Sequence, residues 1–234
     1  MTVLLVMAKA PVAGRVKTRL CPPATPDEAA RIATAALLDT ADAVRDTAGV
    51  TPALALAGEF ADAAPGIGEQ LAAATSGWSV LAQRGNGFAE RLANAHADVA
   101  TAYPGQPILQ IGMDTPQLTG ARLTAAARLL ASTGAVLGFA ADGGWWALGL
   151  RDPRDAEVLR DIPMSRPDTG RRTWLALRGR GLRAAPLPVL RDVDRWTDAL
   201  EVAAIVPTSR FAGQVSTVRS RLPGRSLVAA EVRK

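Results

Sequence analysis

The first apolar segment of the chain runs into a loop that carries four cations before any acidic residue appears. These cations are Lys9, Arg15, Lys17 and Arg19. Like charges this close repel one another, so we expect an anionic ligand among them. Gly14 permits close backbone approach, and a strand followed by glycine and cations suits a diphosphate or triphosphate. The spacing fits neither the P-loop nor the Rossmann fingerprint, and the alternative is an ordinary solvated loop.

A single carboxylate ends the apolar segment "ILQIGMD" near the middle of the chain. Asp114 follows this segment directly, and Pro116 prevents further strand pairing. A carboxylate at such a strand end is positioned to bind Mg²⁺ or Mn²⁺ together with the phosphate or ribose of a nucleotide. The alternative is a helix cap or a turn residue.

Two further segments present carboxylates that could join the same site. Asp142 precedes two glycines in "ADGGWW", where it is either a turn residue or a site residue at a strand end. In "RDVDRW", Asp192 and Asp194 project to the same side if the segment is extended. Two carboxylates facing one way are tolerated most easily with a cation between them.

The elements that must position these residues alternate between strands and helices. We expect strands over 3–8, 51–58, 77–83, 106–114, 135–140 and 145–150, and helices over 27–46, 86–100 and 119–132, with Phe88, Leu92 and Ala95 facing inward in the second helix. This order predicts an α/β fold with a mostly parallel central sheet and helices on both faces. Ligands of such sheets bind at the carboxyl ends of strands, which would bring the 9–19 loop, Asp114 and Asp142 around one crevice.

The pattern is looser after residue 150. Helices are expected to begin near Thr169 and Thr197, and the proline-containing segment 182–190 reads as an edge strand. A last amphipathic helix is indicated by apolar residues at spacings of 4, 3 and 4, namely Phe211, Val215, Val218 and Leu222. We therefore divide the chain into one large domain, 1–206, and a basic helical extension, 207–234.

Composition excludes several classes of protein. The 234 residues suit one large domain, and the net charge of +5 resides in the extension, which has six cations against one acid. A neutral body with a local cationic loop favours a small anionic ligand over nucleic acid. Cys21 is the only cysteine, and no apolar stretch is long enough for a signal peptide or a membrane span, so a cytoplasmic location is expected. His96, the only histidine, is mid-helix and is expected to have no catalytic role.

Five motifs in order give the chain a family resemblance that spans roughly residues 3–206. They are "AKAPVAGRVKTRL", "QRGNGFAERL", "GMDTPQLT", "ADGGWWALGL" and "DVDRWTDAL". Together they resemble the DUF2064 family of glycosyltransferase-A-like proteins, also called arsenosugar-biosynthesis-type glycosyltransferases. The family is similar to nucleotidyltransferases of the same fold, including 2-phospho-lactate guanylyltransferases.

The resemblance implies a single glycosyltransferase-A-like domain and a role for each motif. Nucleotide-binding residues would be Ala8, Lys9, Gly14, Arg15, Lys17, Arg19, Gln83, Gly85 and Asp114, and metal ligands would be Asp114 with Asp192 or Asp194. Lys17 and Arg19 would also stabilise the leaving diphosphate, and Asp142 is the candidate for contacting donor sugar or acceptor, as base. One of Trp145 and Trp146 is expected in the core and the other in the pocket.

The sequence thus predicts a metal-dependent glycosyltransferase that uses Mg²⁺ or Mn²⁺, a nucleotide-sugar donor and a small-molecule acceptor. The alternative is a nucleotidyltransferase that joins an NTP to a phosphorylated or carboxylated substrate and releases pyrophosphate. Departures from the family pattern at Met113, Ala141, Arg195 and Trp196 leave open a catalytically degenerate binding protein. A homodimer is also left open.

Overall fold

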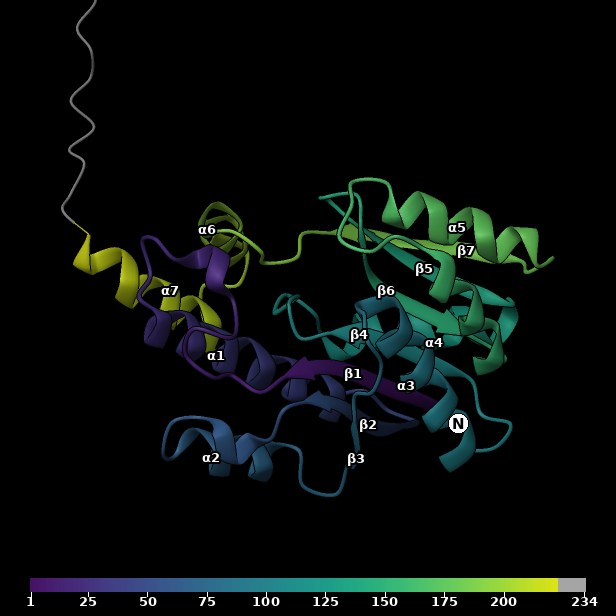
Figure 1. Ribbon diagram of the computed structural model, residues 1–234, viewed down its shortest axis with the longest axis horizontal. Coiled ribbons are helices and arrows are strands. Elements are labelled where there is room, and N and C mark those ends of the chain that lie inside the picture. Colours follow the sequence, from purple (N-terminus) through teal and green to yellow (C-terminus); the bar gives the residue numbers. More distant parts are fainter. Residues whose placement is uncertain (223–234) are drawn as a thin grey trace, which may run out of the picture.

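A seven-stranded sheet forms the centre of the computed structural model, which describes residues 1–222 (Figure 1). The strands are β1 Thr2–Lys9, β2 Val50–Ala57, β3 Ser79–Ala82, β4 Ile108–Gly112, β5 Ala135–Ala140, β6 Trp145–Leu150 and β7 Ala184–Leu190. Their order across the sheet is β3-β2-β1-β4-β6-β5-β7. Residues 3–6 of β1 are apolar and fully buried, as expected for a strand covered on both faces.

The sheet is mostly parallel, as the alternating pattern predicts. Strands β3, β2, β1 and β4 pair in parallel, and so do β5 and β7. Only β6, between β4 and β5, runs antiparallel to its neighbours. Because β6 is reversed, its first residues lie at the same edge of the sheet as the carboxyl end of β4. The expected edge strand is β7, which contains Pro186 and Pro188.

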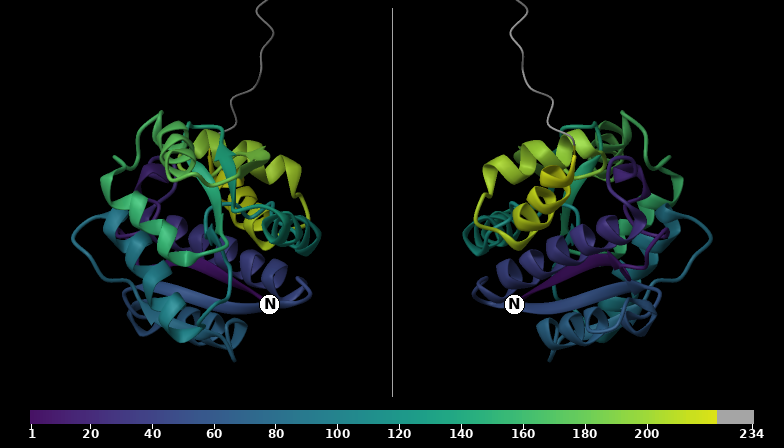
Figure 2. Two further views of the ribbon diagram at one scale, coloured as in Figure 1. Left: turned by 90° about the vertical axis from the view of Figure 1, so that its right-hand side faces the viewer. Right: turned by 90° about the vertical axis from the view of Figure 1, so that its left-hand side faces the viewer.

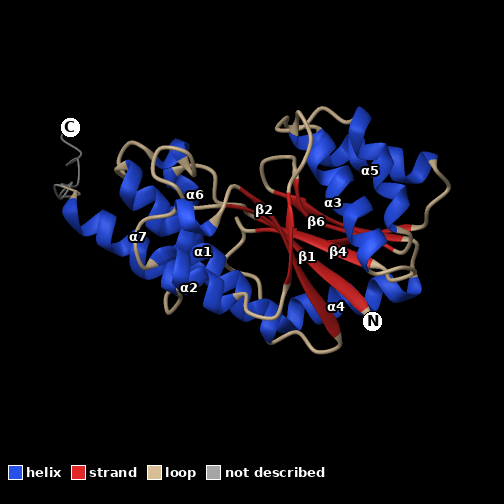
Figure 3. Ribbon diagram, turned by 60° about the horizontal axis from the view of Figure 1, so that its bottom comes forward, coloured by secondary structure: helices blue, strands red, loops and turns tan. Residues whose placement is uncertain are grey.

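Helices cover both faces of the sheet (Figure 3). One face packs against α1 Pro26–Arg45, α2 Ile67–Ala74 and α4 Gly120–Ser132. The other face packs against α3 Phe88–Ala102, the 3₁₀ segment η3 Pro153–Asp161 and α5 Thr169–Gly179. The predicted α/β architecture is therefore confirmed. Two shorter 3₁₀ segments, η1 Thr18–Leu20 and η2 Phe60–Asp62, complete the connections between residues 1 and 74.

One orientation and two elements differ from expectation. Phe88 is 51% exposed, so the prediction that it faces inward with Leu92 and Ala95 is wrong. It is the first residue of α3, where the helix has only just begun, and its ring projects past the core. Helix α2 and segment η3 were not expected. Helix α2 has eight residues and buries only Leu71, so its apolar pattern is too short to detect.

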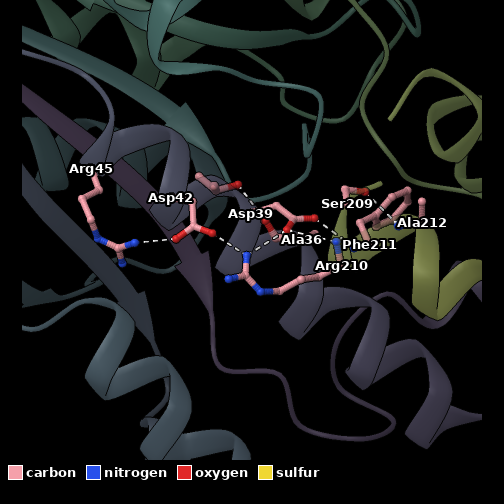
Figure 4. Close-up of polar contacts among 9 residues, drawn as sticks. Ala36, Asp39, Asp42, Arg45, Ser209, Arg210, Phe211 and Ala212 are labelled. Atoms are coloured by element: carbon pink, nitrogen blue, oxygen red, sulfur yellow. Dashed lines mark hydrogen bonds and ion pairs between the residues drawn. The ribbon is translucent and has the colours of Figure 1, made fainter. Parts of the chain in front are cut away.

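Helix α7 Arg210–Arg221 packs on α1 and on α6 Trp196–Ile205, and Figure 2 shows α1 between the sheet and α7. Phe211 is fully buried in this cluster. Asp39 of α1 accepts a hydrogen bond from the Phe211 backbone N–H at 2.9 Å, and Arg210 pairs with Asp39 and Asp42 (Figure 4). At the other end of α7, Arg221 pairs with Glu28 at 2.7 Å.

Acidic residues of α1 thus pair with Arg210 and Arg221, two of the cations of the predicted basic extension. The boundary between 206 and 207 remains a prediction, and residues 223–234 lie outside the described part. Within residues 1–222, no helix combines the length and apolar character needed to cross a bilayer.

Candidate functional site

A cleft of about 550 Å³ opens at the carboxyl ends of β1 and β4 and the start of β6. Strand β1 delivers Ala8 and Lys9 to this cleft, β4 leads into Asp114, and β6 begins with Trp145 and Trp146. Strand β1 lies between β2 and β4, so the chain switches sides of the sheet at this point. Ligands of α/β sheets bind at such switch points, and the cleft is accordingly the candidate functional site.

Lys17 joins three segments at one side of the cleft. Its Nζ lies 2.7 Å from Asp114 Oδ1 and also donates to the carbonyl oxygen of Val193. The Val193 backbone N–H donates to the Asp114 carbonyl at 2.9 Å, so β4 and the 191–195 segment are linked twice. The Lys17 side chain is only 10% exposed, and its backbone has a positive φ of 48°. A lysine held in this conformation is fixed by the ion pair and the packing around it.

Arg19 makes the second ion pair of the opening loop. Its Nη1 lies 2.6 Å from Asp194 Oδ2, and this hydrogen bond raises the pKa of the Arg19 guanidinium. Both side chains are well exposed, so the pair stabilises the fold little and remains open to exchange with a ligand. Two of the four cations of the opening loop, Lys17 and Arg19, therefore pair with carboxylates that are distant along the chain.

Asp192 and Asp142 form the acidic part of the cleft with Asp114. Burial, together with the negative charges of Asp142 and Asp114, raises the pKa of Asp192 to about 6. Asp142 Oδ1 accepts a hydrogen bond from the Gly144 N–H at 2.8 Å, so Asp142 is both a turn residue and a cleft residue. The turn is tight because a Cβ on Gly143 would lie 1.9 Å from the Pro167 carbonyl oxygen.

The structure brings together most of the residues that the sequence analysis singled out. The cleft is lined by Ala8, Lys9, Arg19, Gln83, Asp114, Asp142, Asp192 and Asp194. Lys17 and Arg15 instead line an adjoining hollow of about 240 Å³, which shares Lys9, Arg19, Asp114 and Asp194 with the cleft. Gly14 and Gly85 line neither. Gln83 donates to the carbonyl oxygens of Ala8 and Ala55, which fixes its amide between β1 and β2.

Several cleft residues have no counterpart in the sequence predictions. Gln110 of β4 is 2% exposed, lines the cleft and accepts a hydrogen bond from His96 Nε2 at 2.9 Å. A glutamine inside an otherwise apolar strand is the signal that could have identified it. Arg91 and Arg166 also line the cleft. Met113, where the family pattern has Ser, accepts a contact from the Lys9 backbone N–H through its sulfur at 3.3 Å.

Trp146 lies in the core, as expected for one of the two tryptophans, but both of them line the cleft. Trp146 is 5% exposed and belongs to the core cluster on the α1 side, where its Nε1 donates to the Pro188 carbonyl at 3.0 Å. Trp145 is half-buried and lies on the α3 side. Both residues reach the cleft, with Trp145 the more accessible.

The donor chemistry of the cleft suits a hard divalent cation, because carboxylate oxygens are the groups that Mg²⁺ and Mn²⁺ prefer. The charges of Asp142 and Asp114 raise the pKa of Asp192, which also indicates that these carboxylates lie near one another in the cleft. Among residues 1–222, however, no three acidic, histidine or cysteine side chains converge as a preformed metal site. The cation that contacts Asp114 is the Lys17 ammonium, and Asp194 is taken by Arg19.

Several solved structures share this fold. A crystal structure from Desulfovibrio desulfuricans, described as a "putative nucleotide-diphospho-sugar transferase", is 23% identical, with a TM-score of 0.76 over 94% of this chain and 95% of that one. Rv0371c of Mycobacterium tuberculosis, in complex with manganese, is 19% identical, with a TM-score of 0.52 over 86% and 98%. CMP:2-keto-3-deoxy-manno-octonic acid synthetase, complexed with CTP, is 14% identical, with a TM-score of 0.50 over 88% and 98%. The fold is thus that of nucleotide-sugar transferases and nucleotidyltransferases.

The chain belongs to the DUF2064 family, described as "Uncharacterized protein conserved in bacteria", whose model matches residues 40–166. The resemblance drawn from the five motifs is confirmed. A comparison with curated proteins finds no match.

Proposed function

We propose that this protein is a metal-dependent glycosyltransferase that takes its donor as a nucleotide sugar and passes the sugar to a small-molecule acceptor. The observation that carries the proposal is the Lys17–Asp114 ion pair of 2.7 Å, which unites the cationic loop with a strand-end carboxylate beside the cleft. Cations can bind one side of a pyrophosphate directly. Neighbouring carboxylates can bind its other side through a divalent metal ion. The nucleotide-diphospho-sugar transferase fold and the manganese complex of a structural neighbour support it.

In this proposal the metal would be held by Asp114 together with Asp192 or Asp194, as the resemblance implies. Asp194 is the weaker candidate because its carboxylate already forms an ion pair with Arg19. When bound, the ion would supply charge neutralisation for the diphosphate leaving group. Asp192 is the stronger candidate, since the charge of Asp114 acts on its carboxyl group.

The protein's own groups would act by positioning and by charge. Lys9 and Arg19 line the cleft and would contact the diphosphate, and Lys17 would exchange its ion pair with Asp114 for the same diphosphate and stabilise its charge. The acceptor nucleophile would form a bond to the anomeric carbon as the bond to the diphosphate oxygen breaks, and the nucleoside diphosphate would leave with that electron pair. Asp142, oriented by the Gly144 N–H, would take the proton released by the acceptor.

The second candidate is a nucleotidyltransferase, which the fold of the CTP-bound synthetase favours. In that reaction an oxygen of the second substrate attacks the α-phosphorus of an NTP and pyrophosphate leaves. The same cations and carboxylates would serve either reaction, because both leaving groups are diphosphates.

A thermal-shift screen of UDP, GDP, CDP and TDP sugars with Mn²⁺ tests the proposal. A ligand at about 100 times its Kd adds about 2.7 kcal/mol to the free energy of unfolding. The Arg19→Gln variant, changed at an exposed side chain, should lose that stabilisation, and Arg122→Gln on the surface of α4 is the matched control. Release of pyrophosphate from an NTP, with no response to any nucleotide sugar, would select the second candidate. No response to any nucleotide would contradict both and favour a degenerate binding protein.

A further inference from the structure

The α3 side of the cleft differs in chemistry from the side that carries the ion pairs. Phe88 of α3, Trp145 of β6 and Met164 line the cleft and present apolar surface there. Phe88 is exposed, and Trp145 and Met164 are part of the cluster between the sheet, α3 and α5 without being fully covered. An apolar wall inside a polar cleft indicates contact with an apolar part of a ligand.

Two arginines stand in the same wall. Arg91 is one helical turn after Phe88, so both lie on the same face of α3. Arg166 is in the loop that follows Met164 and leads into α5. Helix α3 packs against η3, which precedes that loop, so neighbouring elements supply the two cations.

Neither arginine forms an ion pair with a residue of the described chain, unlike Arg19. The contact of the Arg91 guanidinium is a hydrogen bond from Nε to the Gly85 carbonyl at 3.2 Å, which leaves its terminal nitrogens free within residues 1–222. The charge of Arg166 acts on Asp168, but that carboxylate already pairs with Arg172 at 2.6 Å. Two cations without carboxylates beside an apolar wall are arranged to receive an anion.

Gln110 supplies a directed polar group at the base of this wall. Its side chain is almost fully buried, and its Oε1 is taken by His96 Nε2. No residue between 1 and 222 accepts a hydrogen bond from its Nε2, and Gln110 lines the cleft. An amide donor that lines the cleft without a protein partner can donate to a ligand oxygen or to water.

We propose that this wall is the acceptor subsite and that it takes a small molecule with an aromatic or apolar body and a carboxylate or phosphate group. Phe88, Trp145 and Met164 bind the body, Arg91 and Arg166 bind the anionic group, and Gln110 Nε2 donates to an oxygen of the ligand. The assignment of an acceptor rests on the proposed function, whereas the chemistry of the subsite does not. The cleft volume of about 550 Å³ lies within the range of small-molecule sites.

The test compares ligands that share a phenyl ring and differ in charge: phenyl phosphate, phenylacetate and neutral 2-phenylethanol, each titrated by calorimetry. At least one anionic probe should bind about tenfold or more tightly than the alcohol. The tighter-binding of phenyl phosphate and phenylacetate shows whether the subsite prefers a phosphate or a carboxylate. The double variant R91Q/R166Q should weaken the anionic probe about tenfold and leave the alcohol unchanged. Arg122→Gln and Arg19→Gln should bind the anionic probe as the unchanged protein does.

Equal binding of the charged and neutral probes, or unchanged anion binding by R91Q/R166Q, would overturn the subsite. Weakening by Arg19→Gln in place of R91Q/R166Q would assign the anion to the opening loop and would overturn it as well. A thermal melt in the absence of probe shows that each variant folds. The nucleotide screen separates the two proposals: if no nucleotide binds while the probes behave as expected, the subsite stands and the proposed function fails.

Discussion

His96 should make the protein less stable as the pH falls, by an amount set by its burial. The side chain is fully buried, its Nε2 donates to Gln110 Oε1, and its Nδ1 has no partner within residues 1–222. Burial lowers its pKa from 6.5 to about 4, against a smaller opposite effect of the Gln110 hydrogen bond. The folded protein therefore keeps His96 neutral at a pH where the unfolded chain has already taken up the proton.

The sign and size of this pH dependence follow from the difference between the folded and unfolded pKa values of His96. A histidine whose folded pKa is lowered contributes stability that is complete above the unfolded pKa and is lost as the pH falls toward the folded pKa. From about 6.5 to about 4 the total loss is about 3 kcal/mol, and about 2 kcal/mol of it appears between pH 7.5 and pH 5. Because the imidazole is fully buried, solvent screening does not reduce this figure.

Asp192 acts in the opposite direction in the same pH range. Its pKa is raised to about 6, so its contribution to stability is present below its unfolded pKa and is lost as the pH rises through about 6. The pH profile of the unchanged protein is therefore a sum of opposing effects. The difference between that profile and the profile of His96→Gln isolates the histidine, since glutamine does not titrate and can still donate to Gln110.

The assay is urea unfolding at several pH values between about 7.5 and 5, followed by circular dichroism. The free energy of unfolding of His96→Gln relative to the unchanged protein should improve by about 2 kcal/mol on going from pH 7.5 to pH 5. Asp192→Asn serves as the companion variant and should shift the profile with the opposite sign. A constant difference between His96→Gln and the unchanged protein across this range would refute a buried, neutral histidine.

Three further changes test the structure at other points. Lys17→Ala removes the ammonium that pairs with Asp114 from a side chain only 10% exposed, so chemical denaturation should show a loss of about 2 kcal/mol, and no loss would contradict a structural ion pair. Phe211→Ala empties a fully buried site between α7 and α1 and should cost about 3–5 kcal/mol, with earlier proteolysis of α7 as a second readout. Gly143→Ala places a Cβ 1.9 Å from the Pro167 carbonyl oxygen at a φ of 91°, so it should lower the melting temperature markedly, and wild-type stability would show that the turn can move.

The fold could be predicted because local signals and burial agree. Strand β1 is apolar on both faces, and α1 begins with a complete capping box in which Thr25 and Glu28 satisfy each other's backbone N–H groups. Helix α2 could not be predicted, since Gly66 and Gly68 lie at its start and one buried leucine gives no period. Phe88 was misjudged because spacing alone does not distinguish the first residue of a helix from a core position.

The sequence predicts where the site residues lie in the fold but not which of them form ion pairs. Strand ends in a parallel sheet must meet at one edge, which is why Lys9, Asp114 and Asp142 share a cleft. Nothing local in the sequence shows that Lys17 reaches Asp114 or that Asp194 lies against Arg19, because each pair joins segments that are distant along the chain. The metal ligands implied by the resemblance, Asp114 with Asp192 or Asp194, stay a prediction.

The cations in and beside the cleft differ in whether they pair with a carboxylate. A cation without an acidic neighbour in the sequence first suggested a ligand, and for Lys17 and Arg19 the structure supplies carboxylates instead. Asp114 and Asp194 can bind a metal only if a ligand anion replaces them as the partners of Lys17 and Arg19. The cations and the carboxylates would therefore exchange partners at the same time. Arg91 and Arg166 have no such carboxylate within residues 1–222, and an anion there displaces no protein group. The acceptor side should therefore bind its anion before any rearrangement, whereas the donor side must open its ion pairs to bind.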